Sequence, residues 1–197
     1  MKHYTLILAT LLSLLIPVQS WGADFRKGEE AFMIGDYATA LREWTPLAEK
    51  GDLAAQFKLA NMYRKGIGVP QDYKTAVKLY NPPAEQGNAL AQYNLGIMYS
   101  FGLGVLQDYE TALKWYILSA EQGNTFAQYN IGRLFHLGHG VKEDMIYAHM
   151  WTNLASLNGF EMSANLRGLI AEQMTQFQIE EAQRLAIDCV AKNFKGC

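Results

Sequence analysis

A period of 36 residues constrains this chain more than any other feature of its sequence. Three consecutive blocks, 53–88, 89–124 and 125–160, align with one another without a gap. So many matches at one offset indicate a repeat array, in which each unit buries its apolar face against its neighbours. The recurring positions include Ala55, Ala91 and Ala127; Gln56, Gln92 and Gln128; Phe57, Tyr93 and Tyr129; Asp72, Asp108 and Asp144; and Gly87, Gly123 and Gly159.

Each block is predicted to form two helices. In the middle block Ala91, Leu95 and Met98 fall at helical spacing. The second helix follows Asp108, whose carboxylate can accept hydrogen bonds from the free N–H groups of a first helical turn. Gly123 suits the left-handed residue that ends many helices. The sequence therefore predicts an all-α fold, a right-handed α/α solenoid of helix-turn-helix repeats.

Atypical units flank the three blocks. Residues 25–52 are predicted to form a degenerate N-terminal repeat, shorter than the others and without the Gly-x-Gly loop. Residues 161–197 are predicted to form C-terminal capping helices, since a repeat array must cover its last core face. Thr175 and Gln178 have the spacing of a capping box. The expected apolar stripes of the two capping helices are Leu166, Leu169, Ile170 and Met174, then Ala182, Leu185, Ala186, Cys189 and Val190.

A proline pair interrupts the first block. Pro82-Pro83 stand where the next block has Leu118-Ser119. Proline inside a helix removes a hydrogen bond and clashes with the preceding turn, at a cost of about 3 kcal/mol. The helix that starts near Tyr73 is therefore expected to end or kink by Leu79–Asn81.

The N-terminus is typical of a signal peptide. Lys2 precedes a largely apolar run over 5–18, which is too short for an ordinary membrane span. Small residues at Ser20 and Gly22 favour cleavage after Gly22, with cleavage after Ser20 nearly as good, and an uncleaved anchor stays open as an alternative. The expected organisation is a signal peptide over 1–22 and a repeat domain over 23–197, in a periplasmic or secreted protein with no membrane span after cleavage.

The net charge of the mature chain limits the classes of partner that it is expected to bind. With Lys2 removed, the mature chain has 16 basic and 19 acidic residues, a net charge of −3, which favours neither nucleic acid nor an anionic membrane as a partner.

The two cysteines, Cys189 and Cys197, would meet an oxidising compartment after export and are predicted to form a disulfide. A buried free thiol at Cys189 is the alternative.

The repeat resembles a known family. Residues 91–99 (AQYNLGIMY), 102–105 (GLGV), 108–116 (DYETALKWY) and 120–124 (AEQGN) are similar to the Sel-one-like repeat (SLR), a subfamily of tetratricopeptide-like α/α solenoids. The resemblance covers 53–160 strongly and 25–52 weakly. It implies a protein–protein adaptor and supplies no catalytic motif. Some relatives with a cysteine pair in each repeat are associated with β-lactam or peptidoglycan-fragment binding, and the repeats here contain no cysteine.

No motif indicates catalysis, a cofactor or a metal. The Gly-x-Gly loops lack the Gly-Lys-Ser/Thr ending of a phosphate-binding loop, and turn geometry explains them. His136, His139 and His149 lack the further ligands that a metal site needs. The chain has no Gly-x-Ser-x-Gly nucleophile motif. We therefore expect no enzyme activity.

The predicted binding site is the concave groove. In tetratricopeptide-like solenoids the first helix of each pair lines this side, and aromatic and arginine side chains often carry the binding energy of interfaces. The first hypothesis is an exported scaffold that binds a peptide or protein partner there; the alternative is a cell-envelope enzyme or binder acting on β-lactams or peptidoglycan fragments. The predicted partner-binding residues are Phe57, Asn61, Arg64, Tyr93, Ile97, Ser100, Phe101, Tyr129, Arg133 and His136, bordered by Phe126 and Leu137.

Overall fold

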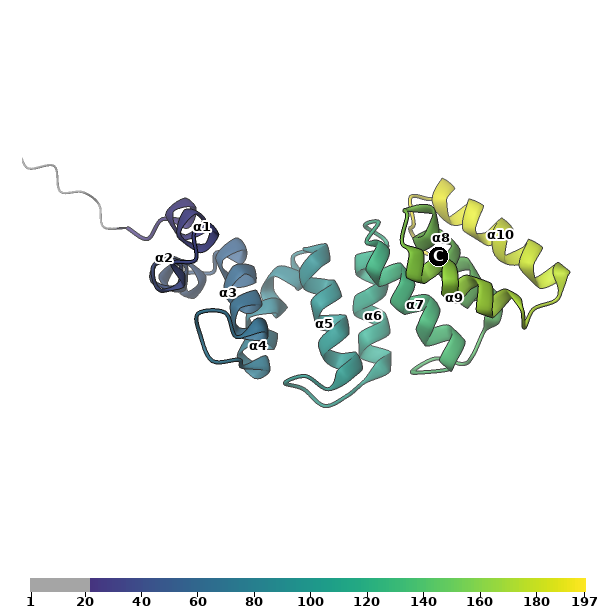
Figure 1. Cartoon of the computed structure of the whole chain (residues 1–197), viewed down its shortest axis with the longest axis horizontal. Coiled ribbons are helices and arrows are strands. Elements are labelled where there is room, and N and C mark those ends of the chain that lie inside the picture. The colour runs from purple at the N-terminus through teal and green to yellow at the C-terminus, as the bar shows by residue number, and fades with distance from the viewer. Residues whose placement is uncertain (1–21) are drawn as a thin grey trace, which may run out of the picture.

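In the part of the chain that the structure describes, ten α-helices follow one another along the long axis of an elongated molecule (Figure 1). The computed structural model describes residues 22–197, so the predicted signal peptide lies almost wholly outside the described residues. Within that range the predicted all-α array of helix pairs is confirmed. The helices are α1 (Phe25–Met33), α2 (Tyr37–Glu49), α3 (Leu53–Lys65), α4 (Tyr73–Glu85), α5 (Ala89–Phe101), α6 (Tyr109–Ala120), α7 (Thr125–Leu137), α8 (Met145–Leu157), α9 (Glu161–Ala171) and α10 (Gln176–Ala191).

The helix starts follow from side-chain caps. In each repeat the first helix begins after Asp52, Asn88 or Asn124, whose side-chain oxygen accepts a hydrogen bond from the backbone N–H three residues later. The second helix begins after Asp72, Asp108 or Asp144 in the same way. A hydrogen bond from the Thr75 side chain lowers the pKa of Asp72, because it stabilises the carboxylate.

The Gly-x-Gly loops do more than turn the chain. Gly104 has a positive φ of 74°, and a Cβ at that position would stand 2.4 Å from the carbonyl carbon of Tyr73. Gly140 approaches Tyr109 in the same way, at 2.5 Å. The second glycine of the loop is therefore needed both for its left-handed conformation and for the contact of each repeat with the first turn of the preceding repeat's second helix.

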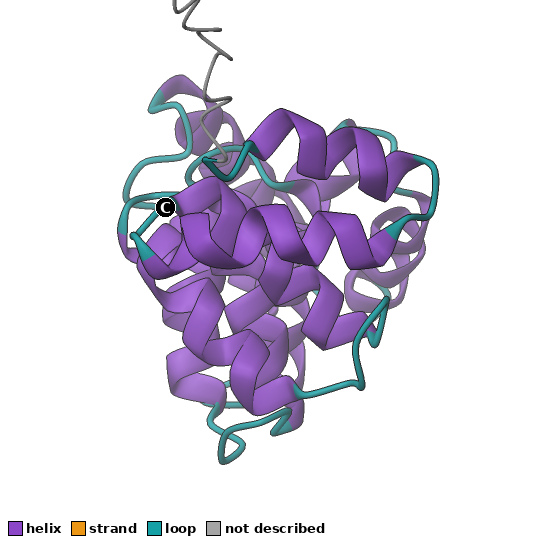
Figure 2. Cartoon of the chain, turned by 90° about the vertical axis from the view of Figure 1, so that its left-hand side faces the viewer, coloured by secondary structure: helices purple, strands orange, loops and turns teal. Residues whose placement is uncertain are grey.

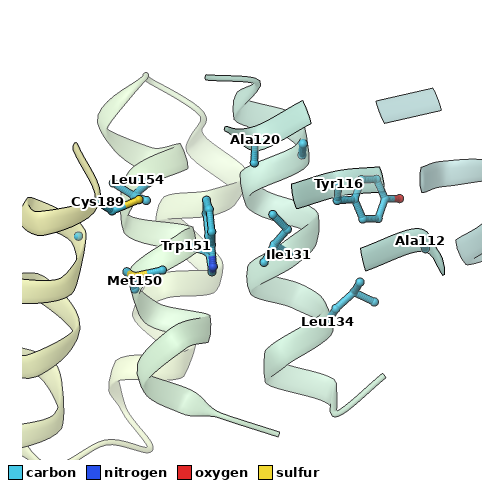
Figure 3. Packing of buried hydrophobic residues seen from close by; sticks show 11 residues of the cluster. Ala112, Tyr116, Ala120, Ile131, Leu134, Met150, Trp151, Leu154 and Cys189 are labelled. Carbon is cyan, nitrogen blue, oxygen red and sulfur yellow. The ribbon is translucent and has the colours of Figure 1, made fainter. Parts of the chain in front are cut away.

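Successive pairs stack with a continuous core. Viewed along the long axis, the helices of successive units overlie one another and the connecting loops lie at the rim (Figure 2). Side chains from four helices meet near the C-terminal end (Figure 3). The buried side chains there include Tyr116 of α6, Ile131 and Leu134 of α7, Met150, Trp151 and Leu154 of α8, and Cys189 of α10.

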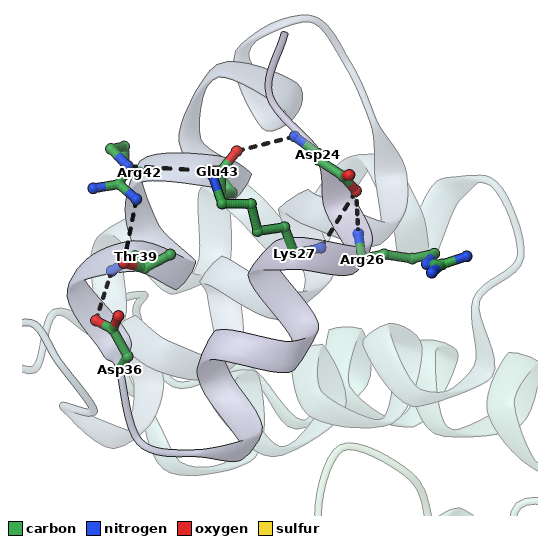
Figure 4. A network of polar contacts seen from close by, with 7 residues as sticks. All are labelled: Asp24, Arg26, Lys27, Asp36, Thr39, Arg42 and Glu43. Carbon is green, nitrogen blue, oxygen red and sulfur yellow. Dashed lines mark hydrogen bonds and ion pairs between the residues drawn. The ribbon is translucent and has the colours of Figure 1, made fainter. Parts of the chain in front are cut away.

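The N-terminal pair has its own polar anchor. Glu43 is buried and forms an ion pair with Lys27 (Nζ to Oε1, 2.7 Å), while its Oε2 accepts a hydrogen bond from the Asp24 backbone N–H at 3.0 Å (Figure 4). The hydrogen bond from Lys27 is the main reason that the pKa of Glu43 is lowered. Trp44, 36 residues before Tyr80, is fully buried and fills the core of this unit.

The prediction that the helix α4 ends by Leu79–Asn81 is wrong. The helix continues through Pro82 and Pro83 to Glu85. Proline has a φ that suits a helix, so the loss here is confined to two N–H donors near the helix end. Pro46 stands 36 residues earlier inside α2, so this array accepts proline at that position in two units.

The C-terminal cap agrees in part with the predicted stripes. Thr175 and Gln178 form the capping box, and Cys189 is joined to Cys197 with a Cα–Cα distance of 5.5 Å. α10 packs on α8. In α9, however, Ile170 is buried whereas Leu169 is exposed, so the predicted stripe of this helix is corrected at Leu169. The predicted stripe of α10 is likewise corrected at Val190, which is 47% exposed.

Candidate partner-binding face

The first helices of successive repeats form one side of the molecule. α5 contacts α7, and α7 contacts α9, more closely than the second helices α4, α6 and α8 approach one another. Closer approach on one side indicates that the array curves toward that side. We call the surface formed by α3, α5, α7 and α9 the inner face.

A row of apolar side chains runs along the inner face at the repeat period. Leu90, Phe126 and Met162 stand 36 residues apart and are 55%, 50% and 58% exposed. Exposed apolar side chains at one offset in three successive units are more than the scattered apolar residues of an ordinary surface. From the sequence, Phe126 was predicted only to border the partner-binding residues, and Leu90 and Met162 were not predicted to take part. The 36-residue period relates all three positions and could have identified them.

A second row lies near the C-terminal ends of the same helices. It contains Lys65, Phe101 and Leu137, and the last two are 57% and 48% exposed. The guanidinium carbon of Arg133 lies 5.7 Å from the centre of the Phe101 ring, a cation–π distance. The predicted residues Phe101 and Arg133 are therefore brought together at the surface.

The aromatic side chains that recur at the position of Tyr93 in each repeat both pack inside the molecule and reach its surface. Phe57, Tyr93 and Tyr129 are each half-buried. Tyr93 lies 6.0 Å from the ring of Tyr116 below it and 6.0 Å from that of Phe126 in the next repeat. Burial raises the pKa of Tyr93. Each ring presents only part of its surface to a partner.

Asn61 and Arg64, two of the predicted partner-binding residues, form hydrogen bonds with the buried hydroxyl of Tyr80. The Tyr80 hydroxyl donates to Asn61 Oδ1 at 2.9 Å, and Arg64 Nε donates to the same hydroxyl at 3.1 Å. Burial of Tyr80 raises its pKa. Asn61 and Arg64 are thus partly committed to the core, because a buried hydroxyl needs hydrogen-bond partners.

Ser100 is removed from the predicted site. Its side chain is only 1% exposed, and its Oγ donates a hydrogen bond of 3.2 Å to the hydroxyl of Tyr116. Burial raises the pKa of Tyr116 to about 12. Ser100 and Arg64 occupy the same position of the repeat, and each hydrogen-bonds the buried tyrosine hydroxyl of its own repeat, Tyr116 and Tyr80 respectively.

The third repeat breaks this pattern. Thr152 replaces the tyrosine of the other repeats, and its hydroxyl donates to the Ala148 carbonyl within its own helix. His136 is then left without a tyrosine partner, and its Nδ1 lies 3.5 Å from Met145 Sδ. Arg133 and His136 are both partly exposed, and so is Ile97 in the second repeat.

A hollow borders the N-terminal end of the inner face. Its volume is about 480 Å³, and the ion pair between Lys58 and Glu29 (Nζ to Oε1, 2.8 Å) lies in its wall. A second hollow, of about 550 Å³, lies away from the inner face near Trp115 and Lys195. Neither was expected from the sequence, because each depends on how units and tail meet.

The histidines singled out in the sequence as metal-ligand candidates are not gathered into a metal site within the described residues. No group of three histidine, cysteine, aspartate or glutamate side chains within residues 22–197 could hold a metal ion. His139 stacks on Tyr109 with ring centres 4.6 Å apart, and His149 is buried. Nor does any helix of this range have the length and apolar character to cross a membrane.

Comparisons with known proteins agree with this architecture. The family model described as Sel1 repeat matches residues 53–88, 89–124 and 125–160. A crystal structure of a Sel1 repeat protein from Oxalobacter formigenes superposes with a TM-score of 0.68 at 32% identity, covering 74% of this chain and 60% of that protein. A protective antigen present in uropathogenic Escherichia coli strains, which displays an SLR fold, superposes with a TM-score of 0.53 at 26% identity.

That second similarity covers 86% of this chain and 46% of the antigen. The chain therefore spans about half of the Escherichia coli antigen and 60% of the Oxalobacter formigenes protein. Among curated proteins, none matches significantly.

Proposed function

Since the chain belongs to the Sel1 repeat family, whose repeats generally mediate protein–protein interaction, we propose that it is an exported scaffold that binds a protein or peptide partner on its inner face. The observation that carries the proposal is the exposed apolar row of Leu90, Phe126 and Met162. A partner that covered this row would bury apolar surface, the main favourable term of most protein association.

Export is supported by two features. The sequence of 1–22 has the pattern of a signal peptide, and the Cys189–Cys197 disulfide suits an oxidising compartment. Mass spectrometry of protein recovered from the periplasm or medium should find Ala23 or Trp21 at the N-terminus. A chain that begins at Met1 would contradict export by cleavage.

Partner capture tests the binding role. Tagged protein should retain specific envelope or secreted proteins, and the double variant Leu90→Asp/Leu137→Asp should lose them, because each aspartate places a charge in the apolar rows. The matched control is Leu106→Asp/Ile187→Asp, which changes two exposed aliphatic residues outside the inner face. Equal capture by the two double variants would argue against the inner face.

The envelope-enzyme alternative has no comparable support. None of the residues described on the inner face forms a nucleophile–base pair, and the one disulfide of the described range lies in the C-terminal cap. Turnover of the β-lactam nitrocefin by the purified protein would overturn the scaffold proposal.

A further inference from the structure

The inner face differs in charge from the rest of the molecule. The helices α3, α5 and α7 contain no aspartate or glutamate, although the whole chain has more acidic than basic residues. In the fourth helix of the inner face, α9, the one acidic residue is Glu161 in its first turn. The helices α3, α5 and α7 carry four cationic side chains: Lys58, Arg64, Lys65 and Arg133. Because no carboxylate of these three helices offsets the four positive charges, this part of the inner face attracts anionic groups.

Two of these cations are available to a partner. Lys58 already pairs with Glu29, and Arg64 donates to the Tyr80 hydroxyl. Within residues 22–197, Lys65 and Arg133 form no ion pair with any carboxylate. Lys65 is exposed and Arg133 is partly exposed.

Apolar surface lies between the two cations. Lys65 is in the first repeat and Arg133 in the third, and Ile97 and Phe101 of the second repeat lie between them in sequence and in the stack. Phe101 is exposed and lies under the Arg133 guanidinium. The order along the inner face is therefore cation, apolar surface, cation.

The separation of the cations sets the length of a matching segment. The first helices of successive repeats pack mainly on the second helices between them, so one repeat step is at least the axis distance of two packed helices, about 8–10 Å. Two repeat steps therefore correspond to at least about 16–20 Å. Because an extended chain advances about 3.3 Å per residue, a segment would need at least about five or six residues to reach from one cation to the other.

We propose that the inner face binds an extended acidic segment of a partner protein, with two carboxylates at least five or six residues apart at Lys65 and Arg133 and bulky apolar side chains between them on Ile97 and Phe101. This inference rests on the proposed function and specifies the chemistry of the partner. Side chains recognised at alternate positions of an extended peptide would give specificity, while the ion pairs would direct encounter.

The test uses three labelled ten-residue peptides and fluorescence anisotropy with the purified protein. The first peptide has glutamates six residues apart with leucine and phenylalanine between them and glycine and serine elsewhere. The second replaces both glutamates by lysine, and the third replaces leucine and phenylalanine by alanine. We expect the first to bind at least tenfold more tightly than either of the others, with the advantage over the lysine peptide shrinking between 50 and 300 mM NaCl.

Charge reversal on the protein supplies the control. Lys65→Glu/Arg133→Glu should reverse the preference between the glutamate and lysine peptides. Lys78→Glu/Lys114→Glu makes the same change in net charge on the exposed sides of α4 and α6 and should leave the preference unchanged. Equal loss in both double variants would show a nonspecific charge effect and overturn the proposal.

The remaining outcomes separate this inference from the proposed function. If the glutamate and lysine peptides bind equally and Leu90→Asp/Leu137→Asp abolishes both, the inner face binds peptides but the acidic preference is wrong. If none of the peptides binds, the acidic segment is wrong, and capture of whole proteins still decides the proposed function. Binding of a ten-nucleotide oligothymidylate as tight as that of the glutamate peptide would point to nucleic acid and overturn the proposal.

Discussion

The ring of Tyr116 lies directly against the backbone of Gly96. A Cβ at Gly96 would stand 2.5 Å from the ring, closer than real Cβ contacts. Gly96 and Tyr116 are both buried, on the two helices α5 and α6 of one repeat. The absence of a side chain at Gly96 is therefore what allows the ring, and with it the second helix, to pack this closely.

Gly96→Leu should destabilise the protein by about 1–3 kcal/mol, because the added side chain overpacks the helix pair. The measurement is the urea midpoint of unfolding. Gly168→Leu is the matched control, since no atom lies within 4 Å of a Cβ built at Gly168. That control should be neutral or slightly stabilising, because glycine is unfavourable inside a helix. Equal losses in the two variants would mean that the Tyr116 contact is not the cause.

Gln92 and Gln128 occupy the same position in successive repeats but differ in their hydrogen bonds, so replacing each should affect stability differently. Gln92 Nε2 donates to the Ala84 carbonyl at 2.9 Å, and Gln92 Oε1 accepts a hydrogen bond from Gln122 Nε2 at 2.8 Å. Both side-chain polar atoms of the fully buried Gln128, in contrast, have no partner among the described residues. Gln92→Met should cost about 1–3 kcal/mol, the net value of two hydrogen bonds, while Gln128→Met should be neutral or stabilising. Thermal unfolding of both variants measures the difference, and a larger loss at Gln128 would contradict this account.

His149 should make stability depend on pH. Burial, with a smaller contribution from Arg167, lowers the pKa of His149 below 6.5. The unfolded chain then binds the proton more readily than the folded chain, so stability is fully present above about pH 6.5 and is lost as the pH falls toward the folded-state pKa. His149→Leu should reduce the drop in melting temperature between pH 7.5 and 5, and His136→Asn, which keeps His149, should retain it. An unchanged drop in His149→Leu would exclude His149 as its source.

The C-terminal disulfide should stabilise the cap. Cys197→Ser should lower the free energy of unfolding by about 2–3 kcal/mol, the chain-entropy value for a loop this short. Thiol counting on the denatured parent protein should find no free cysteine. Reductant should destabilise the parent protein and leave Cys197→Ser unchanged, and two reactive thiols or a disulfide-linked dimer in the parent would contradict the intramolecular bridge.

Much of the fold could be predicted from the sequence because its signals are local. Asp108 and Gly102 act within one helical turn of their own position, and the period shows which turns are equivalent. Pro82 misled the prediction because the cost of a proline was considered without its counterpart Pro46. Ser100 misled it for a different reason: its burial depends on the hydroxyl of Tyr116, 16 residues away across the helix pair. The lack of aspartate and glutamate in α3, α5 and α7 could have been read from the sequence, because the first helices were already expected to line one side of the array.

The C-terminal residues after α10 contact the end of α6, beyond the helix α8 on which α10 packs. The backbone N–H of Gly196 donates to the Glu121 carboxylate at 3.0 Å, and Lys195 Nζ lies 3.6 Å from the same side chain, at the end of α6. In an ideal linear array each unit is coupled only to the units beside it, and unfolding can spread from either end. The tail closes the last units into a loop of contacts that runs from α6 through α7, α8 and α10 and back to the end of α6. Fraying should therefore begin at α1 and α2, while the units from α6 onward should exchange their amide hydrogens together, as one cooperative block.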